Sequence, residues 1–323
     1  DIDFDNIGRI QSITALTDGE NILESPAILG STFLGAHIDS IQATVKDFDG
    51  GAAISGCEFT ARTATYVDSE GAFNNTGSIG SIRVDSKSRI GNGIEKSTFL
   101  AGAAGSIGDI DVDVFSPKQS RPEGMSDAEF AAYYNDYNRG ASGRAIDQCQ
   151  FRATSLDPDQ SALTGTIGSI RIQAGRVIPE LVPDLLLPPD RIPPNDQSTL
   201  EAAGINASYF AAYGGIGRIT INTIGTGVFG SAFLANTDPL NGVAGILANT
   251  LITRRVPGDI AKLTVNATGR SASGTVLSLF TGSGIGDVSV SANGFPIPDP
   301  TAWVRQLQNL APLATALQSG QFL

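Results

Sequence analysis

The sequence predicts an all-β fold in which short parallel strands wind into a solenoid of about 8 to 9 coils. Composition is the first reason, because 38 of the 323 residues are glycine and only one is methionine. Such a composition is typical of short strands joined by tight turns. The second reason is that two short phrases alternate along the whole chain at variable distances. A wound chain gives this pattern, because each coil travels a fixed circuit while extra residues bulge at its corners.

The first phrase reads Ile-Gly-x-Ile-x-Val and should form the strand of one wall. Its copies begin at Ile7, Ile38, Ile79, Ile107, Ile167, Ile216, Ile260 and Ile285, with a degenerate copy at Leu240. Because side chains alternate along a strand, the second apolar residue of each copy should point inward and stack on the next coil. These residues are Ile10, Ile41, Ile82, Ile110, Ile170, Ile219, Leu263 and Val288. The glycine of the phrase is expected at a corner, in a tight turn or with a positive φ.

The second phrase, Ser-x-Phe-x-Ala, should form the opposite wall. Its copies begin at Ser31, Cys57, Ser97, Cys149, Ser208, Ser231, Asn249 and Ser278. The apolar residues at its centre should make a second inward ladder, formed by Phe33, Phe59, Phe99, Phe151, Phe210, Phe233, Leu251 and Phe280. Two ladders on separate walls then enclose one core.

With phrases such as IGSIRV at Ile79 and STFLA at Ser97, the chain resembles the extracellular parallel β-helix proteins of bacteria over residues 7–294. That group holds surface and adhesin-type repeat proteins, autotransporter-type passengers, phage tailspikes and pectin-active enzymes. The resemblance implies a right-handed coil and a location outside the cell, at the bacterial surface or in the periplasm. It leaves function open, because this architecture serves structural, adhesive and catalytic tasks alike.

Charge and hydropathy exclude some partners. The formal net charge of −12 and the pI near 4.5 disfavour binding to nucleic acid or to an anionic membrane surface. No run of 18 apolar residues occurs, so no transmembrane segment is expected,. Only two cysteines are present, a number that fits a secreted bacterial protein.

The cysteines and the single histidine give little support for catalysis. Cys57 and Cys149 occupy the serine slot of coils two apart, with Ser97 between them, so about 9 to 10 Å separates them. A disulfide needs a shorter distance, and we expect two free, buried thiols. His37, the only histidine, immediately precedes a strand. It is expected to be a corner residue, because nothing in the sequence pairs it with a nucleophile or an acid.

Charged residues alternate along the outward slot of the first wall. Arg83, Asp111 and Arg171 should lie on successive coils, beside Asp85, Asp109 and Asp113. The simpler interpretation is charge pairing across an exposed sheet. No cofactor is then expected.

A catalytic interpretation follows from the resemblance to pectin- and alginate-type lyases. It implies that Asp109, Asp111 and Asp113 bind Ca²⁺ while Arg83 or Arg171 is the base. Hydrolases of this fold use paired aspartates, for which Asp109 and Asp111 are the candidates.

Two long insertions occupy the same corner of consecutive coils. Residues 115–141 contain a capping box, Ser126 with Glu129, and should form a short helix. Residues 175–203 contain six prolines, which favour an extended strap. Together they are expected to form a lateral lobe, either covering its own apolar side chains or binding a protein or glycan. The helix should present Phe130, Tyr133, Tyr134 and Tyr137.

The two ends of the chain differ. Residues 1–294 form the predicted β-helix, and residues 295–323 form a predicted helix that caps the coil or docks on a neighbour. Its apolar stripe contains Trp303, Leu307 and Leu310,. The N-terminus opens directly into the first phrase at Ile7. This start suggests pairing with another chain or with a preceding domain.

The leading functional hypothesis is a noncatalytic extracellular module, structural or adhesive, within a larger assembly. Its expected partners are other protein subunits or a second copy, bound through the coil ends and the lateral lobe. A polysaccharide lyase or glycoside hydrolase acting on acidic glycans is one alternative. A glycan-binding module without turnover is the other.

Overall fold

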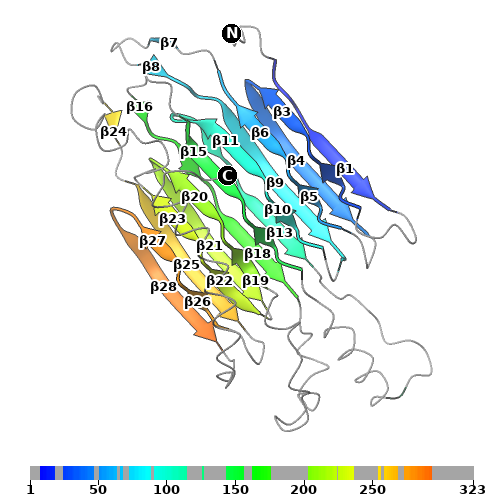
Figure 1. The fold of residues 1–323 in the computed structure, drawn as a ribbon. Coiled ribbons are helices and arrows are strands. Elements are labelled where there is room, and N and C mark those ends of the chain that lie inside the picture. The colour runs from blue at the N-terminus through cyan, green and yellow to red at the C-terminus, as the bar shows by residue number, and fades with distance from the viewer. Residues whose placement is uncertain are drawn as a thin grey trace.

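The structure is a computed structural model, and its strands wind into the predicted parallel β-helix (Figure 1). It describes residues 8–18, 25–46, 51–63, 66–67, 73–88, 91–114, 126, 143–155, 162–175, 203–223, 225–235, 254–255, 258–267 and 273–292. Three sheets, here named A, B and C, run the length of the coil. All pairings within them are parallel, as stacking of successive coils requires,.

Sheet A has ten strands and is the widest wall. The strands are β1 (Ile13–Thr17), β4 (His37–Val45), β9 (Ser78–Ser86), β12 (Ser106–Ile107), β13 (Ile110–Val114), β17 (Thr166–Ile167), β18 (Ile170–Ala174), β21 (Gly215–Thr223), β25 (Asp259–Ala267) and β28 (Ile285–Ala292). Five of them span eight or nine residues, and β1 spans five. In two coils the sheet A segment is split into two shorter strands, β12 with β13 and β17 with β18.

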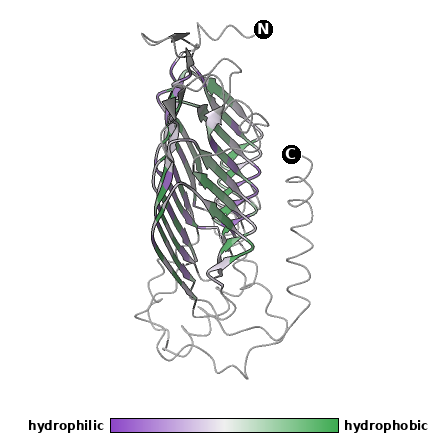
Figure 2. Ribbon diagram, turned by 90° about the vertical axis from the view of Figure 1, so that its left-hand side faces the viewer, coloured by the Kyte–Doolittle hydropathy of each residue, from purple (hydrophilic) through white to green (hydrophobic). Residues whose placement is uncertain are grey.

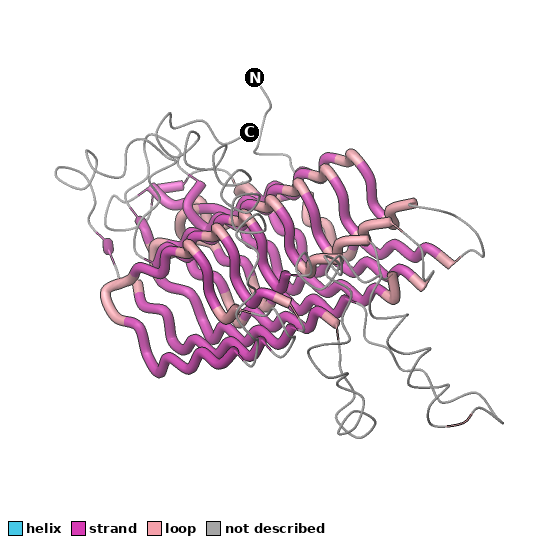
Figure 3. The backbone as a smooth tube through the Cα atoms, turned by 60° about the horizontal axis from the view of Figure 1, so that its bottom comes forward, coloured by secondary structure: helices cyan, strands magenta, loops and turns pink. Residues whose placement is uncertain are grey.

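Sheets B and C have seven strands each. Sheet B consists of β2 (Ile28–Leu29), β5 (Ile54–Ser55), β10 (Ile94–Glu95), β14 (Ile146–Asp147), β19 (Ala203–Asn206), β22 (Thr226–Phe229) and β26 (Thr275–Val276). Sheet C consists of β3 (Thr32–Gly35), β6 (Glu58–Ala61), β11 (Thr98–Gly102), β15 (Gln150–Ser155), β20 (Tyr209–Ala212), β23 (Ala232–Ala235) and β27 (Leu279–Thr281). The chain visits A, B and C in turn and then begins the next coil (Figure 3).

Two small pairings stand beside the coil. Strands β7 (Tyr66–Val67) and β8 (Phe73–Asn74) are antiparallel, while β16 (Ala162–Leu163) and β24 (Arg254–Arg255) are parallel. Within the described residues, no helix is long and apolar enough to cross a membrane.

The predicted phenylalanine ladder is confirmed along sheet C. Consecutive ring centroids are 4.6–5.0 Å apart and the rings are within 7° of parallel. This spacing matches the separation of neighbouring strands, about 4.8 Å. The ladder contains Phe33, Phe59, Phe99, Phe151, Phe210, Phe233 and Phe280, of which the middle five are fully buried. In Figure 2 the strands of the walls carry the hydrophobic residues that enclose this core.

The degenerate copy at Leu240 does not add a coil between β21 and β25. Strand β21 pairs directly with β25, and the ring of Phe233 stacks on that of Phe280 at 4.8 Å. No coil fits between them, so Leu251 has no place in the ladder. The match was misleading because this stretch lacks both the Ile-Gly start and the phenylalanine. Residues 236–253 lie outside the described residues.

The inward rows of sheet A are as predicted except in the first coil. Ile13, and not Ile10, pairs with Ile41, while Ile10 bridges to Ile38. The prediction was shifted by three residues because Ile7, Ile10 and Ile13 repeat at that interval, so either pair of isoleucines fits the phrase. The outward residue beside Gln42 is therefore Thr14.

The glycine of the first phrase has a different role from the one predicted. None of its described copies has a positive φ. A Cβ on Gly80 would collide with the carbonyl oxygen of Asp39, and one on Gly108 would lie 2.5 Å from that of Gly80. The glycine is therefore required by the close approach of one coil's backbone to the next.

Seven of the nine positive φ angles among the described residues lie instead at the corner between sheets B and C, here called the B–C corner. A single residue there takes the left-handed conformation in each coil, with φ of 44–62°. These residues are Gly30, Gly56, Lys96, Gln148, Ala207, Gly230 and Leu277.

Sheet B was not predicted. Its signal was the Ile or Val that stands five residues before each phenylalanine from Phe33 to Phe233.

Replacing Ala207 with glycine should stabilise the protein. Ala207 has a φ of 44°, a conformation that costs an L-residue about 1 to 2 kcal/mol and costs glycine nothing. After subtraction of glycine's entropic penalty, we expect a gain of about 0.5 to 1 kcal/mol in unfolding free energy. Ala211→Gly is the control, because Ala211 is a buried residue of β20 and should lose stability. Chemical denaturation monitored by circular dichroism measures both, and equal effects would contradict the argument.

Of the predicted insertions, residues 115–141 and 175–203, the structure describes only Ser126, Gly175 and Ala203. Their flanking strands do fix their place: residues 115–145 connect β13 to β14, and residues 175–202 connect β18 to β19. Both therefore leave the corner between sheets A and B, in consecutive coils. The predicted helical segment 295–323 is also outside the described residues.

Candidate functional sites on the outer faces of the coil

The predicted row of alternating charge is present on the outer face of sheet A. Strand β13 lies between β9 and β18, so Asp111 has Arg83 on one side and Arg171 on the other. Arg171 Nη2 donates to Asp111 Oδ2 at 2.8 Å. The two side chains are 48% and 34% exposed, so this is a surface ion pair, worth about 1 kcal/mol or less.

Electrostatics keep Arg171 protonated. The hydrogen bond that Arg171 donates to Asp111 raises the pKa of the Arg171 guanidinium. The charges of Asp111 and Asp113 raise this pKa further, and burial opposes the shift. A general base must lose its proton near neutral pH. The raised pKa favours the ion pair over proton abstraction at this position.

The neighbouring aspartates are placed by the same register. Asp109 Oδ1 accepts a hydrogen bond from the backbone N–H of Ser169 at 2.8 Å, which ties it to the next coil. Asp113 lies between Asp85 and Gln173. In the part of the chain that the structure describes, no three His, Cys, Asp or Glu side chains are grouped to hold a metal ion.

His37 is the first residue of β4 and so lies at the N-terminal end of this strand. Its Nδ1 accepts a hydrogen bond from the backbone N–H of Ser78 at 3.3 Å. This contact links two coils. The imidazole is half-buried.

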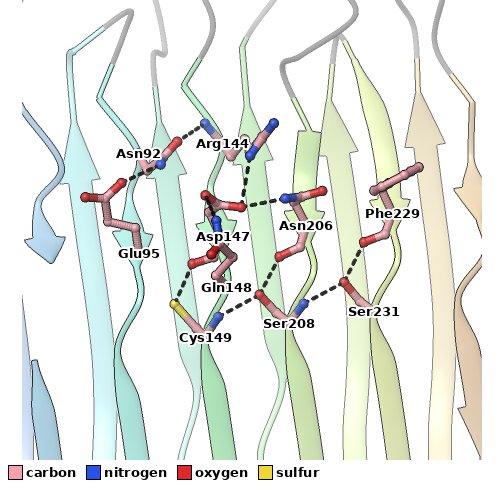
Figure 4. Close-up of polar contacts among 10 residues, drawn as sticks. All are labelled: Asn92, Glu95, Arg144, Asp147, Gln148, Cys149, Asn206, Ser208, Phe229 and Ser231. Atoms are coloured by element: carbon pink, nitrogen blue, oxygen red, sulfur yellow. Dashed lines mark hydrogen bonds and ion pairs between the residues drawn. The ribbon is translucent and has the colours of Figure 1, made fainter. Parts of the chain in front are cut away.

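A ladder of hydroxyl and thiol groups runs along the B–C corner. Each group donates to the carbonyl oxygen two residues earlier, as in the bond from Ser208 Oγ to Asn206 at 2.7 Å. In several coils it also accepts the N–H of its counterpart in the preceding coil, as Ser231 Oγ does from Ser208 at 3.1 Å (Figure 4). The members are Ser31, Cys57, Ser97, Cys149, Ser208, Ser231 and Ser278.

The two cysteines belong to this ladder and are free and buried, as predicted. Cys57 Sγ and Cys149 Sγ each lie 3.2 Å from the carbonyl oxygen two residues earlier, where serine hydroxyls donate in the other coils. Burial raises the pKa of the Cys149 thiol, a shift that hydrogen bonds with backbone groups partly offset. The arrangement is that of structural thiols rather than of a reactive nucleophile.

We expect both thiols to resist alkylation in the folded protein. The raised pKa of Cys149 suppresses its thiolate at mildly alkaline pH, and burial excludes the reagent from both sulfur atoms,. Mass spectrometry after treatment with N-ethylmaleimide should show no adduct under native conditions and two adducts in guanidinium chloride. An adduct on the folded chain would mean that the B–C corner opens readily.

A second polar cluster, absent from the sequence predictions, lies on the outer face of sheet B. It joins carboxylates and amides of successive coils and is here called the sheet B network (Figure 4). Its members are Ser55, Asn92, Glu95, Arg144, Asp147, Gln148 and Asn206. Although Asp147 faces outward, its side chain is only 6% exposed.

Asp147 is the centre of this network. Its Oδ1 accepts from Arg144 Nη1 at 3.0 Å and from Asn206 Nδ2 at 2.5 Å. Its Oδ2 accepts from Gln148 Nε2 at 3.3 Å. A buried carboxylate needs such partners, because an unpaired charge away from water is costly.

Glu95, in the coil before that of Asp147, is also held by hydrogen bonds. Its two oxygens accept from Ser55 Oγ and Asn92 Nδ2, both at 2.7 Å. The Oδ1 of Asn92 accepts the backbone N–H of Arg144 at 2.8 Å. The network therefore crosses four coils, and its acidic groups bind the protein's own donors.

The aromatic and leucine candidates for partner binding lie outside the described residues. These are Phe130, Tyr133, Tyr134, Tyr137, Trp303, Leu307 and Leu310. The structure therefore leaves their roles as predictions.

Comparison with known protein families, with curated proteins and with solved structures gives no match. The function must therefore be argued from the outer faces of the coil itself. The described candidates fall into three arrays: the charged row of sheet A, the sheet B network and the mostly buried ladder of the B–C corner. In each array, polar groups of one coil bind those of the next.

Proposed function

We propose that the protein is a noncatalytic structural or adhesive β-helix module that acts outside the bacterial cell as a subunit of a larger assembly. The observation that carries this proposal is that the central acidic groups of the charged row and of the sheet B network are bound to donors of the coil itself. Asp111 is paired with Arg171, and Asp147 with Arg144 and Asn206. These contacts cross-link neighbouring coils and stiffen a rod.

The location outside the cell is supported by composition. The chain has two cysteines and a net charge of −12, which suit a protein that stays soluble and avoids mispaired disulfides in an oxidising compartment. Both cysteines are buried and free, so folding there requires no disulfide between them.

The rival function is a polysaccharide lyase or hydrolase, favoured by the open, exposed position of Arg83 beside Asp111 on sheet A. An assay separates the two functions. The purified chain is incubated with polygalacturonate and with alginate, each with and without Ca²⁺. The products are followed by ultraviolet absorbance for unsaturated uronates and by a reducing-end assay.

We expect no turnover in any of these reactions. Turnover that disappears in Asp111→Asn would overturn the proposal and identify the charged row of sheet A as an active site. Binding of a glycan without turnover, lost in Tyr134→Ala, would favour the glycan-binding alternative instead.

A further inference from the structure

The two ends of the coil expose opposite edges of the same sheets. Among the described strands, β1 pairs only with β4, and β28 pairs only with β25. They lie at opposite ends of the molecule (Figure 1). A free strand edge carries unpaired N–H and C=O groups and is a template for another strand.

Large exposed hydrophobic residues occur only in the two end coils, within the residues that the structure describes. In the first coil they are Leu16 and Leu29, which are 56% and 63% exposed. In the last coil they are Leu277, Leu279, Ile285, Val288 and Val290, which are 41–59% exposed. The interior coils carry none, so the exposed apolar surface is concentrated where the coil ends.

The exposure of β28 affects residues that belong to the core rows. Val288 pairs with Leu263, and Val290 with Val265. One coil earlier those partners are 4% and 0% exposed, whereas Val288 and Val290 are 59% and 45% exposed. The last coil therefore presents core side chains in the geometry that another coil would cover.

The first coil presents matching side chains at the other end. Ile10, Ile13 and Ala15 begin the rows that Ile285, Val288 and Val290 end, and Phe33 begins the ring ladder that Phe280 ends. All four of these first-coil side chains are only half-buried. Each of these rows of sheet A is apolar at both of its ends, so in this sheet one end could continue the other without a change of register.

We propose that the β28 edge binds the β1 edge of a second copy of this chain. The strands run parallel with Val288 opposite Ile13, and sheet A continues across the junction. The inference rests on the proposed function and names the partner of that assembly. A head-to-tail contact of this kind uses two different surfaces and does not close, so it builds open stacks rather than a dimer.

The test is the association of the full chain and of two end variants. Sedimentation velocity over a range of concentrations, with negative-stain microscopy, should show stacks of the unmodified chain. Val288→Lys and Ile13→Lys change side chains at opposite ends of one row, of which Val288 is exposed and Ile13 is half-buried, so both should fold. Each should weaken self-association roughly tenfold or more, because the junction would bury a charge. Ser289→Lys, on the outward side of β28, is the control and should still form stacks.

Mixing the two variants gives the sharpest result. The unmodified β28 end of Ile13→Lys can bind the unmodified β1 end of Val288→Lys, so the mixture should form a heterodimer and nothing longer. Its mass should be twice the 33.4 kDa of the chain. This outcome distinguishes a head-to-tail junction from a symmetric one, in which mixing restores nothing.

Three outcomes would overturn the inference. The first is an unmodified chain that stays monomeric while the amides of β28 exchange freely with solvent. The second is a monomer with protected β28 amides, which would assign this edge to the chain's own residues 293–323. The third is a closed dimer that does not grow. None of them affects the assay for uronate release, so failure of the junction and failure of the noncatalytic function are distinguishable.

Discussion

Phe151→Ala should destabilise the protein by about 3 to 5 kcal/mol. The ring of Phe151 is fully buried and stacks between those of Phe99 at 4.6 Å and Phe210 at 4.8 Å. Truncation removes the burial of one ring and both of its stacking contacts, and it leaves a cavity that the strands cannot close while their register is fixed. Denaturant unfolding followed by circular dichroism measures the loss.

The matched control is Phe280→Ala at the end of the same ladder. Phe280 is half-buried and stacks on Phe233, so its truncation should cost about 1 to 2 kcal/mol. Phe151→Leu should cost less than Phe151→Ala because it keeps more of the volume. A stacked array can unfold in steps, so the slope of the transition must be compared among the variants. Equal losses at Phe151 and Phe280 would mean that the ladder does not act as a packed core.

Asp147→Ala is expected to have the second-largest effect, a loss of about 3 kcal/mol. The carboxylate is 6% exposed and accepts from Arg144, Gln148 and Asn206. Its removal takes a partner from three donors, and Arg144 keeps its charge beside the emptied position. Asp147→Asn should lose less, because the amide oxygen still accepts a hydrogen bond.

Asp111→Ala on sheet A is the control for this prediction. Asp111 also pairs with an arginine, at 2.8 Å, but the two side chains are 34% and 48% exposed. Removing it should therefore cost about 1 kcal/mol or less, and moderate salt should reduce that cost further. The same denaturation measurements at low and high salt separate the two sites. A larger loss at Asp111 than at Asp147 would contradict the role of burial.

Sheets A and C were predictable because their strands are long enough to show a pattern. In strands such as β9 and β11 every second residue points inward. The same inward position holds an isoleucine or a phenylalanine in most coils, and this repeat identifies the strands from the sequence alone. Sheet B strands have two to four residues, too few for a period to appear. The match at Leu240 is the opposite error, a coil predicted where none lies. It resembled the first phrase but had no phenylalanine in the second phrase that followed it.

The same difference explains which candidate sites were predictable. The register of the first phrase was sufficient to place Asp111 between Arg83 and Arg171, because all three stand at one position of the repeat. The partners of Asp147 come from the turn before its own strand and from sheet B of the next coil. Without sheet B there was no row in which Asp147 and Asn206 could be recognised as neighbours.

The B–C corner also determines where the chain tolerates foreign sequence. Its length is the same in every coil, with one left-handed residue and one serine or cysteine, whereas the corners after β13 and β18 hold insertions of very different composition. A peptide for surface display is therefore best grafted after Val114 or Gly175. One extra residue between Lys96 and Ser97 would shift Phe99 to the outer face of β11 and reverse every side chain of that strand.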